Sequence, residues 1–228
     1  MATLIHNMFK FFSFQQNEEA EAQSEVYRRN DYDISDSICI TDPKAVREEV
    51  CRIYSQLYPQ ATTKHITQAF IDFERIYKGE YPEHYAAETP YHDIQHSLDV
   101  ALCMARILAG YNATEAEARK IGSDLAEIGI IVALFCDVGY IRKHDDHFIE
   151  NGAVFTANHV SRGADFLGVY LHDIGLDHQA EFAKKLIHFT GYEVETDNIH
   201  SENHKQKILG YMVGSADLVA QLADRCYL

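Results

Sequence analysis

The sequence predicts an all-α protein, a single-domain multi-helix bundle preceded by an N-terminal arm. Apolar residues recur at spacings of three and four along most of the 228 residues, which is the helical pattern. Only four prolines interrupt this pattern, and the alternation typical of strands is nearly absent. Hydrophobic residues make up 46% of the chain and charged residues 24%, as in an ordinary globular domain with an apolar core.

The formal net charge of −15 limits the classes of partner. Such a surface repels phosphate backbones, so no nucleic-acid polymer is expected to bind. A small phosphorylated ligand stays open, because a bound cation can reverse the sign locally. Five widely spaced cysteines without a CxxC motif favour a reduced compartment, and we expect a cytoplasmic protein. The apolar start is too short and interrupted for a membrane span, so no membrane partner is expected.

Residues 1–36 are expected to form the N-terminal arm and an acidic linker. Residues 3–14 mix apolar and polar positions and contain a cluster of phenylalanines, whereas residues 15–36 are polar and acidic. An arm of this kind packs either on the body of its own chain or on a second copy, which leaves a homodimer open. The helical domain is expected to occupy residues 37–228.

Two helices are predicted before residue 80. Asp42 followed by Pro43 is a helix start, and apolar positions extend that helix over residues 43–58. Apolar spacings of four, three and four predict the second helix over residues 63–78. Tyr77 ends this second stripe, and we expect its hydroxyl to lie near water.

The third predicted helix begins near Tyr91 and ends near Gly110. His92 and His96 lie four residues apart in it and therefore share one face. His96 continues into a core stripe made of Val100, Cys103 and Ile107. Two histidines at this spacing are usually a surface pair or a satisfied core pair. A histidine at the end of a core stripe nevertheless needs a partner, whether a carboxylate, a backbone carbonyl or a metal.

A long helix is predicted next, over residues 115–136. Thr114 and Glu117 have the spacing of a capping box at its start. Its last part, residues 128–135, is apolar on every side, which is typical of a central buried helix. Asp137 follows directly, and a carboxylate buried there alone would be costly. The alternative is that Asp137 is an ordinary capping or turn residue.

Three further helices are predicted from apolar periodicity, over residues 150–171, 176–190 and 201–226. His159 lies in the middle of the first, His188 lies near the apolar face of the second, and Asp217 lies on the flank of the apolar stripe of the last. Residues 140–147, which precede these helices, are rich in charge. We expect them to form a surface loop in which His144 and His147 are solvated.

Several polar side chains are therefore directed towards the interior from separate helices. They are His92, His96, Asp137 and Asp217, and less firmly His159 and His188. Converging imidazoles and carboxylates are the ligands that a divalent metal site requires. A divalent metal, Zn, Fe, Mn or Mg, is the expected cofactor.

Three motifs in this set resemble a known superfamily. Residues 91–100, YHDIQHSLDV, closely resemble the cyclic-nucleotide phosphodiesterase signature Y-H-N-x-x-H-A-x-D-V. Residues 133–139, ALFCDVG, resemble the H-D-x-G segment of the HD-domain phosphohydrolase superfamily. Residues 214–218, GSADL, resemble its late A-D-L segment. The resemblance extends over roughly residues 89–225 and implies an HD-like helical fold.

The resemblance also implies residue roles. His96 would be a metal ligand, Asp137 the main or shared ligand, and Asp217 the last ligand. His92 would protonate the leaving oxygen while a metal-activated water attacks phosphorus. A neighbouring acid, Asp93 or Asp99, would orient a histidine. In the related HD-GYP branch, histidines at the positions of His159 and His188 would hold a second metal; the alternative is that both are satisfied helix histidines.

The sequence departs from the family pattern at three positions. Cys136 replaces the histidine of the HD pair, and is either a thiolate ligand or a small apolar residue. Tyr140 stands where phosphodiesterases have histidine and HD-GYP proteins have lysine, and Asp93 replaces asparagine. The leading hypothesis is a metal-dependent phosphohydrolase or phosphodiesterase that acts on a small phosphate ester or a cyclic nucleotide. The alternatives are a degenerate module that binds a metal or ligand for sensing, and a helical interaction protein with structural histidines.

Overall fold

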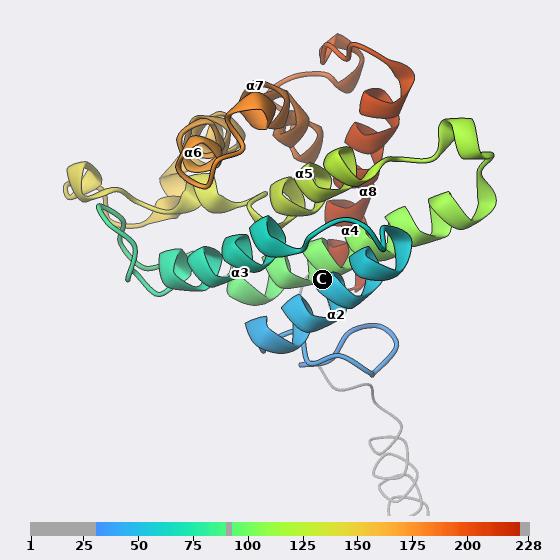
Figure 1. Cartoon of the computed structure of the whole chain (residues 1–228). Helices are drawn as coiled ribbons and strands as arrows, with labels where there is room; N and C mark the ends of the chain where they lie inside the picture. Colours follow the sequence, from blue (N-terminus) through green and yellow to red (C-terminus); the bar gives the residue numbers. More distant parts are fainter. Residues whose placement is uncertain (1–30, 90–92, 224–228) are drawn as a thin grey trace, which may run out of the picture.

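The computed structural model describes residues 31–89 and 93–223, and within these residues it confirms the all-α multi-helix class. Figure 1 shows the α-helices gathered in one bundle. Their bounds are α2 Pro43–Leu57, α3 Lys64–Tyr77, α4 Ile94–Thr114, α5 Ser123–Leu134, α6 His159–Asp173, α7 Asp177–Leu186 and α8 His204–Ala223. Across these two ranges there is no β-strand, and only two isolated bridges pair backbone segments.

The predicted N-terminal arm lies almost wholly outside the described residues, as do His92 and Cys226. The division at residue 36 therefore stays a prediction. The four described cysteines are all free thiols. Among the described helices, none is long and apolar enough to cross a membrane.

Helix α5 is the central helix of the bundle, as its apolar sequence predicts. It contacts α3, α4, α7 and α8, and its residues from Ile128 to Leu134 are all buried. Figure 1 shows it between α4 and the upper helices α6 and α7. Gly129 allows the tightest of these contacts, because a Cβ there would lie 2.8 Å from Met104 and 2.9 Å from Leu209. The end of α5 is consequently buried, and Phe135 and Cys136, which follow it, are buried as well.

The junction between α4 and α5 differs from the prediction. Helix α4 continues past Gly110 to Thr114, and α5 begins only at Ser123. The side chain of Thr114 does not cap a new helix. Its hydroxyl donates instead to the carbonyls of Gly110 and Tyr111 within α4. The predicted helix over residues 115–136 is therefore wrong at its start.

A buried asparagine explains this junction. The side chain of Asn112 donates to the carbonyl of Ile121 at 3.0 Å and accepts from its backbone N–H at 2.9 Å. It also donates to the hydroxyl of Tyr58 at 2.9 Å. The bonds between Asn112 and Ile121 join residues nine positions apart and fix the turn between α4 and α5. They override the local capping signal of Thr114 and Glu117.

The later helices are shorter than predicted. Residues 152–155 form a separate 3-10 turn, so α6 begins at His159 rather than near residue 150. Helix α7 ends at Leu186 and a 3-10 turn continues over residues 187–190. Helix α8 matches the last prediction over the residues described.

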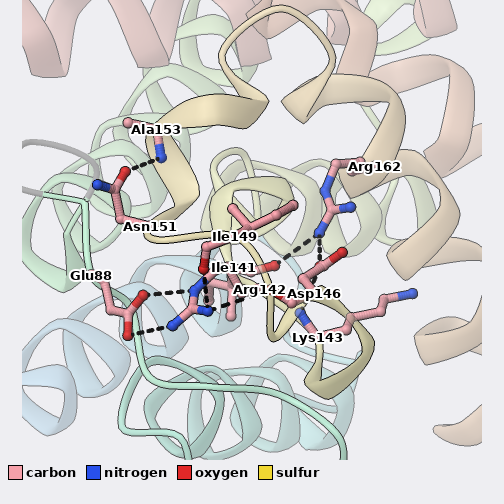
Figure 2. A network of polar contacts seen from close by, with 9 residues as sticks. All are labelled: Glu88, Ile141, Arg142, Lys143, Asp146, Ile149, Asn151, Ala153 and Arg162. Carbon is pink, nitrogen blue, oxygen red and sulfur yellow. Dashed lines mark hydrogen bonds and ion pairs between the residues drawn. The ribbon is translucent and has the colours of Figure 1, made fainter.

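Two arginines hold the long connection between α5 and α6 (Figure 2). Arg142 donates to both carboxylate oxygens of Glu88 at 2.8 Å and to the carbonyl of Ile149 at 2.6 Å. Arg162 donates to Asp146 at 2.9 Å and to the carbonyl of Ile141 at 3.2 Å. The two arginines thus fix the segment that follows Asp137, in addition to the short 3-10 turns within it.

Candidate metal centre

His96 enters the interior from the first turn of α4. The carboxylate of Asp93 caps this helix by accepting from the backbone N–H groups of Gln95 at 3.0 Å and His96 at 3.1 Å. Asp93 is therefore engaged with the helix end, where an asparagine would cap equally well. The cap fixes the backbone of His96, so the direction of its side chain follows from the helix geometry.

Cys136 and Asp137 follow the buried end of α5. The backbone continues into a 3-10 turn over residues 138–140, against which α6 packs very closely. A Cβ on Gly139 would collide with the carbonyl of His159, so only glycine fits here. Arg162 donates to the carbonyl of Gly139 at 2.9 Å and holds the same turn from α6. The position of Asp137 is set by α5 on one side and this turn on the other.

Asp217 is contributed by α8, which crosses α4 and α5. Gly214, one turn earlier, allows the 3-10 turn over residues 187–190 to lie against α8, because a Cβ would strike the carbonyl of Phe189. This packing places the carboxylate of Asp217 between the interior and the surface of the bundle.

The three elements meet at the ring of His96. Its Nε2 lies 3.0 Å from Oδ1 of Asp217 and 3.5 Å from Oδ2 of Asp137. The ligand atoms of His96, Cys136 and Asp137 all lie within 4.8 Å of one another. The four residues are buried, with exposed fractions of 5%, 1%, 5% and 8% for His96, Cys136, Asp137 and Asp217. Residues 121 positions apart in sequence thus form one polar group in the core.

Electrostatics within the group favour positive charge. Burial opposes protonation of His96, but the hydrogen bond to Asp217 and the charge of Asp137 outweigh it and raise the pKa of the imidazole. Burial, together with the charges of Asp137 and Asp217, raises the pKa of the Cys136 thiol well above its usual range. The group therefore gains from any cation placed among its ligands.

The donor set fits a divalent metal. An imidazole, a thiol and two carboxylates are the ligand types found around Zn²⁺ and Fe²⁺, and carboxylates also suit Mn²⁺ and Mg²⁺. Positive charge placed next to the two carboxylates would stabilise their ionised form in the core. His96, Cys136, Asp137 and Asp217 are the residues that would hold the ion.

A cleft of about 520 Å³ opens beside Asp217. Its lining residues include Phe189, Tyr192, Tyr211, Gly214, Ser215 and Asp217. Tyr192 and Tyr211 are exposed, at 97% and 42%. A small molecule in this cleft would reach the centre from the α8 side.

The structure places the two later histidines differently from the central group. His159 is the first residue of α6; its Nδ1 donates to the carbonyl of Thr156 at 3.0 Å, and its ring stacks on Tyr140 at 4.3 Å. His188 lies in the 3-10 turn, and its buried Nδ1 has no hydrogen-bond partner among the described residues. Neither belongs to the group of ligand atoms around His96. Their role in a second metal site stays a prediction.

Two surface predictions agree with the structure, and one prediction does not. His144 and His147 are exposed on the connection between α5 and α6, as expected of a solvated loop. The hydroxyl of Tyr77, expected near water, is buried and lies 3.0 Å from the hydroxyl of Ser97. The reason is that the hydroxyl of Ser97, from α4, lies next to the hydroxyl of Tyr77 in the interior. Ser97 gave no signal of its own in the sequence, beyond being a small polar residue next to His96.

Comparisons with known proteins add no relative. No family model matches the chain, and no curated protein or solved structure matches it significantly. The interpretation of the site therefore depends on its own residues.

Proposed function

We propose that this protein is a metal-dependent phosphohydrolase or phosphodiesterase that acts on a small phosphate ester or a cyclic nucleotide. The main support is the buried contact of His96 with Asp137 and Asp217, which come from helices far apart in the chain. The order of these residues and of Cys136 is the order in the superfamily that the sequence resembles. The resemblance of the motifs and the convergence of these residues in space both support the proposal.

The roles of the chain's own residues follow from their positions. His96, Asp137 and Asp217 would hold the cation, with Cys136 as a further ligand from the same side. A bound divalent cation supplies Lewis acidity, which lowers the pKa of water and offsets charge on phosphoryl oxygens. The ester would lie in the cleft beside Asp217, with its phosphate towards the interior. His92 is proposed as the proton donor to the leaving oxygen.

The test combines metal analysis with hydrolysis of an activated aryl phosphodiester. Purified protein is expected to retain a divalent metal or to bind one on reconstitution, and to hydrolyse the ester only in its presence. His96→Ala and Asp137→Ala should each reduce this rate to background. The matched control is His147→Ala, which removes an exposed histidine and should leave the rate unchanged. Absence of any bound metal after reconstitution would reject the proposal.

A second candidate is a degenerate module that binds a metal or a ligand without turnover. Cys136 and Tyr140 favour it, because both replace residues of the family pattern next to Asp137. This candidate predicts normal metal binding with no hydrolysis across a panel of phosphate esters and nucleotides. Metal-dependent hydrolysis that His96→Ala abolishes would reject it.

A further inference from the structure

A small hollow lies where the segment after α3 meets α6. Its volume is about 170 Å³, which is less than that of a drug-sized site and suits only a small ligand. The ring side chains that line it are Tyr81, His84, Phe166 and Tyr170. Of the described residues around it, none belongs to the candidate metal centre. We name this second site the aromatic hollow.

The four rings of the aromatic hollow pack as one series. The centroid of the His84 ring lies 5.8 Å from that of Tyr81 and 5.8 Å from that of Phe166. The Phe166 centroid lies 5.5 Å from that of Tyr170. Val169, which is 66% exposed, adds apolar surface to the lining. Because aromatic faces carry partial negative charge, a lining of this kind attracts a cation that also has apolar surface.

A strained turn sets the positions of Tyr81 and His84. The backbone N–H of His84 donates to the carbonyl of Tyr81 at 3.3 Å, and Pro82 takes the second position of the turn, which favours proline. Glu83, at the third position, has a φ of 61°, in the left-handed region that favours glycine. The backbone N–H of His144 donates to the carbonyl of Glu83 at 2.8 Å and holds this turn from the connection between α5 and α6. Strain of this kind persists where the surroundings fix it, and it is concentrated at ligand sites.

Tyr81 already receives a cation on one side of its ring. Cζ of Arg75 lies 5.6 Å from the ring centroid, and Arg75 in turn pairs with Asp72 at 3.3 Å. Arg75 lines the larger hollow next to α3, whereas Tyr81 lines both that hollow and the aromatic one. The tyrosine ring therefore separates the two hollows, and its side away from Arg75 faces the aromatic hollow.

The charged groups around the aromatic hollow are mostly acidic. Three exposed carboxylates line it together with one exposed ammonium group, and these residues are Glu83, Asp165, Asp173 and Lys143. The Nδ1 of His84 donates to the carbonyl of Pro82 at 2.7 Å, which fixes the ring. Burial, together with the charges of Lys143 and His144, lowers the pKa of His84, so its imidazole adds no positive charge at neutral pH. The balance of charge therefore favours a positively charged occupant.

We propose that the aromatic hollow is a binding site for a small quaternary ammonium ligand. The methyl groups of such a cation would contact the rings and Val169, while the nearby carboxylates would attract its charge. A primary ammonium is more strongly hydrated and would have to lose that water to enter. The site uses residues outside the candidate metal centre, so the inference goes beyond the proposed function and does not depend on metal or hydrolysis.

The test titrates the full-length protein with tetramethylammonium and with choline at constant ionic strength and follows binding by NMR. The matched probe is the neutral analogue of choline in which carbon replaces nitrogen, since it has the same shape without the charge. We expect saturable binding of both cations, with chemical-shift changes centred on Tyr81, His84 and Phe166. The neutral analogue should bind about 10-fold more weakly than choline.

Substitutions at Tyr81 separate the ring from its hydroxyl. Tyr81→Leu removes the aromatic face and should weaken choline binding about 3- to 30-fold, whereas Tyr81→Phe keeps the face and should bind as the wild type does. Asp165→Asn removes one exposed acid and should weaken binding about 2-fold, an effect that salt reduces. The control is Phe148→Leu, which removes an aromatic ring that is 77% exposed on the connection between α5 and α6. It should leave the affinity unchanged.

Three results would overturn the inference. Equal affinity for choline and its neutral analogue would show that the hollow selects apolar shape and not charge. Chemical-shift changes centred on the cleft beside Asp217 would place the ligand elsewhere, and unchanged affinity in folded Tyr81→Leu would remove the rings from recognition. If Tyr81→Leu does not fold, the wild-type preference for choline over its neutral analogue decides, together with the loss in Asp165→Asn.

Discussion

Buried carboxylates in this protein are neutralised in two different ways. Asp33 is completely buried and is held by its own cation, since Nη1 of Arg106 lies 2.8 Å from Oδ2 of Asp33. Backbone N–H groups of Ile38 and Ser37 donate to the same carboxylate at 2.6 and 2.8 Å. Asp137 and Asp217 instead both approach the single imidazole of His96.

The difference separates a structural acid from a candidate ligand. The arginine and backbone donors around Asp33 are permanent parts of the fold, and they stabilise its charge near neutral pH. A protonated histidine carries one positive charge, and a divalent cation carries more charge in the same place. The comparison predicts that the contribution of Asp33 to the free energy of unfolding is independent of bound metal. The contribution of Asp217 should depend on it.

The largest effect on stability is expected from Arg106→Ala. It would remove the guanidinium that lies 2.8 Å from the buried carboxylate of Asp33, and loss of one partner from a buried pair costs about 3 kcal/mol. Chemical denaturation with and without Zn²⁺ measures the free energy of unfolding. The free energy of unfolding should fall by the same amount with and without Zn²⁺. A smaller fall in the presence of Zn²⁺ would contradict the statement that the role of Asp33 is independent of metal.

The next largest effect is the metal's own stabilisation. With Zn²⁺ at 100 times its dissociation constant, the free energy of unfolding should rise by about 2.7 kcal/mol. Asp217→Asn keeps a hydrogen-bond acceptor for His96 but removes a charge, so most of this gain should disappear. Asp145→Asn, an exposed acid, is the control and should retain the full gain in thermal denaturation.

A smaller effect is expected at a further buried acid, Asp72. Asp72 accepts hydrogen bonds from Gln68 at 2.9 Å, from Arg75 at 3.3 Å and from the hydroxyl of Tyr170 at 3.2 Å. Tyr170→Phe removes one of three donors, which should cost about 1 kcal/mol. Denaturation in urea measures this loss, and a gain in stability would show that Asp72 is already satisfied by its other donors.

The smallest effect near neutral pH concerns the titration of Asp33. Burial opposes its charge, but hydrogen bonds from Ser35, Ile38 and Ser37 outweigh it and hold its pKa well below the usual range. The lowered pKa adds stability that is present above about pH 4 and is lost as the pH falls towards the folded-state value. Between pH 5 and 7 this contribution should be constant. Acid titration of wild type against Asp33→Asn measures it, and their difference should shrink only below about pH 4.

Much of the fold could be predicted from local patterns, because periodicity and burial agree along most helices. The apolar sequence before Asp137 predicts a central helix, and α5 is central. The junction at Asn112 could not be predicted, since its hydrogen bonds reach Tyr58 and Ile121 from other elements. The start of α6 was missed because Asn151 caps a separate 3-10 turn by accepting from Ala153 at 3.0 Å.

The candidate site was predictable to a similar degree. His96, Asp137 and Asp217 each stand where a helix pattern buries a polar group, and the structure brings them together with Cys136. Their role as ligands stays a prediction. Ser97 and Tyr77 could not be placed, because a contact between α3 and α4 creates their partnership. His159 and His188 lie on well-predicted segments, but their ring positions depend on turns that periodicity does not define.

The braced connection between α5 and α6 divides the candidate ligands unequally. His96, Cys136 and Asp137 precede it, while Asp217 follows it, and its middle is exposed at Asp145 and His147. A chain split at that point would yield two fragments, neither with the complete ligand set. If the proposed cation binds at this group, its binding would require that the two fragments reassociate.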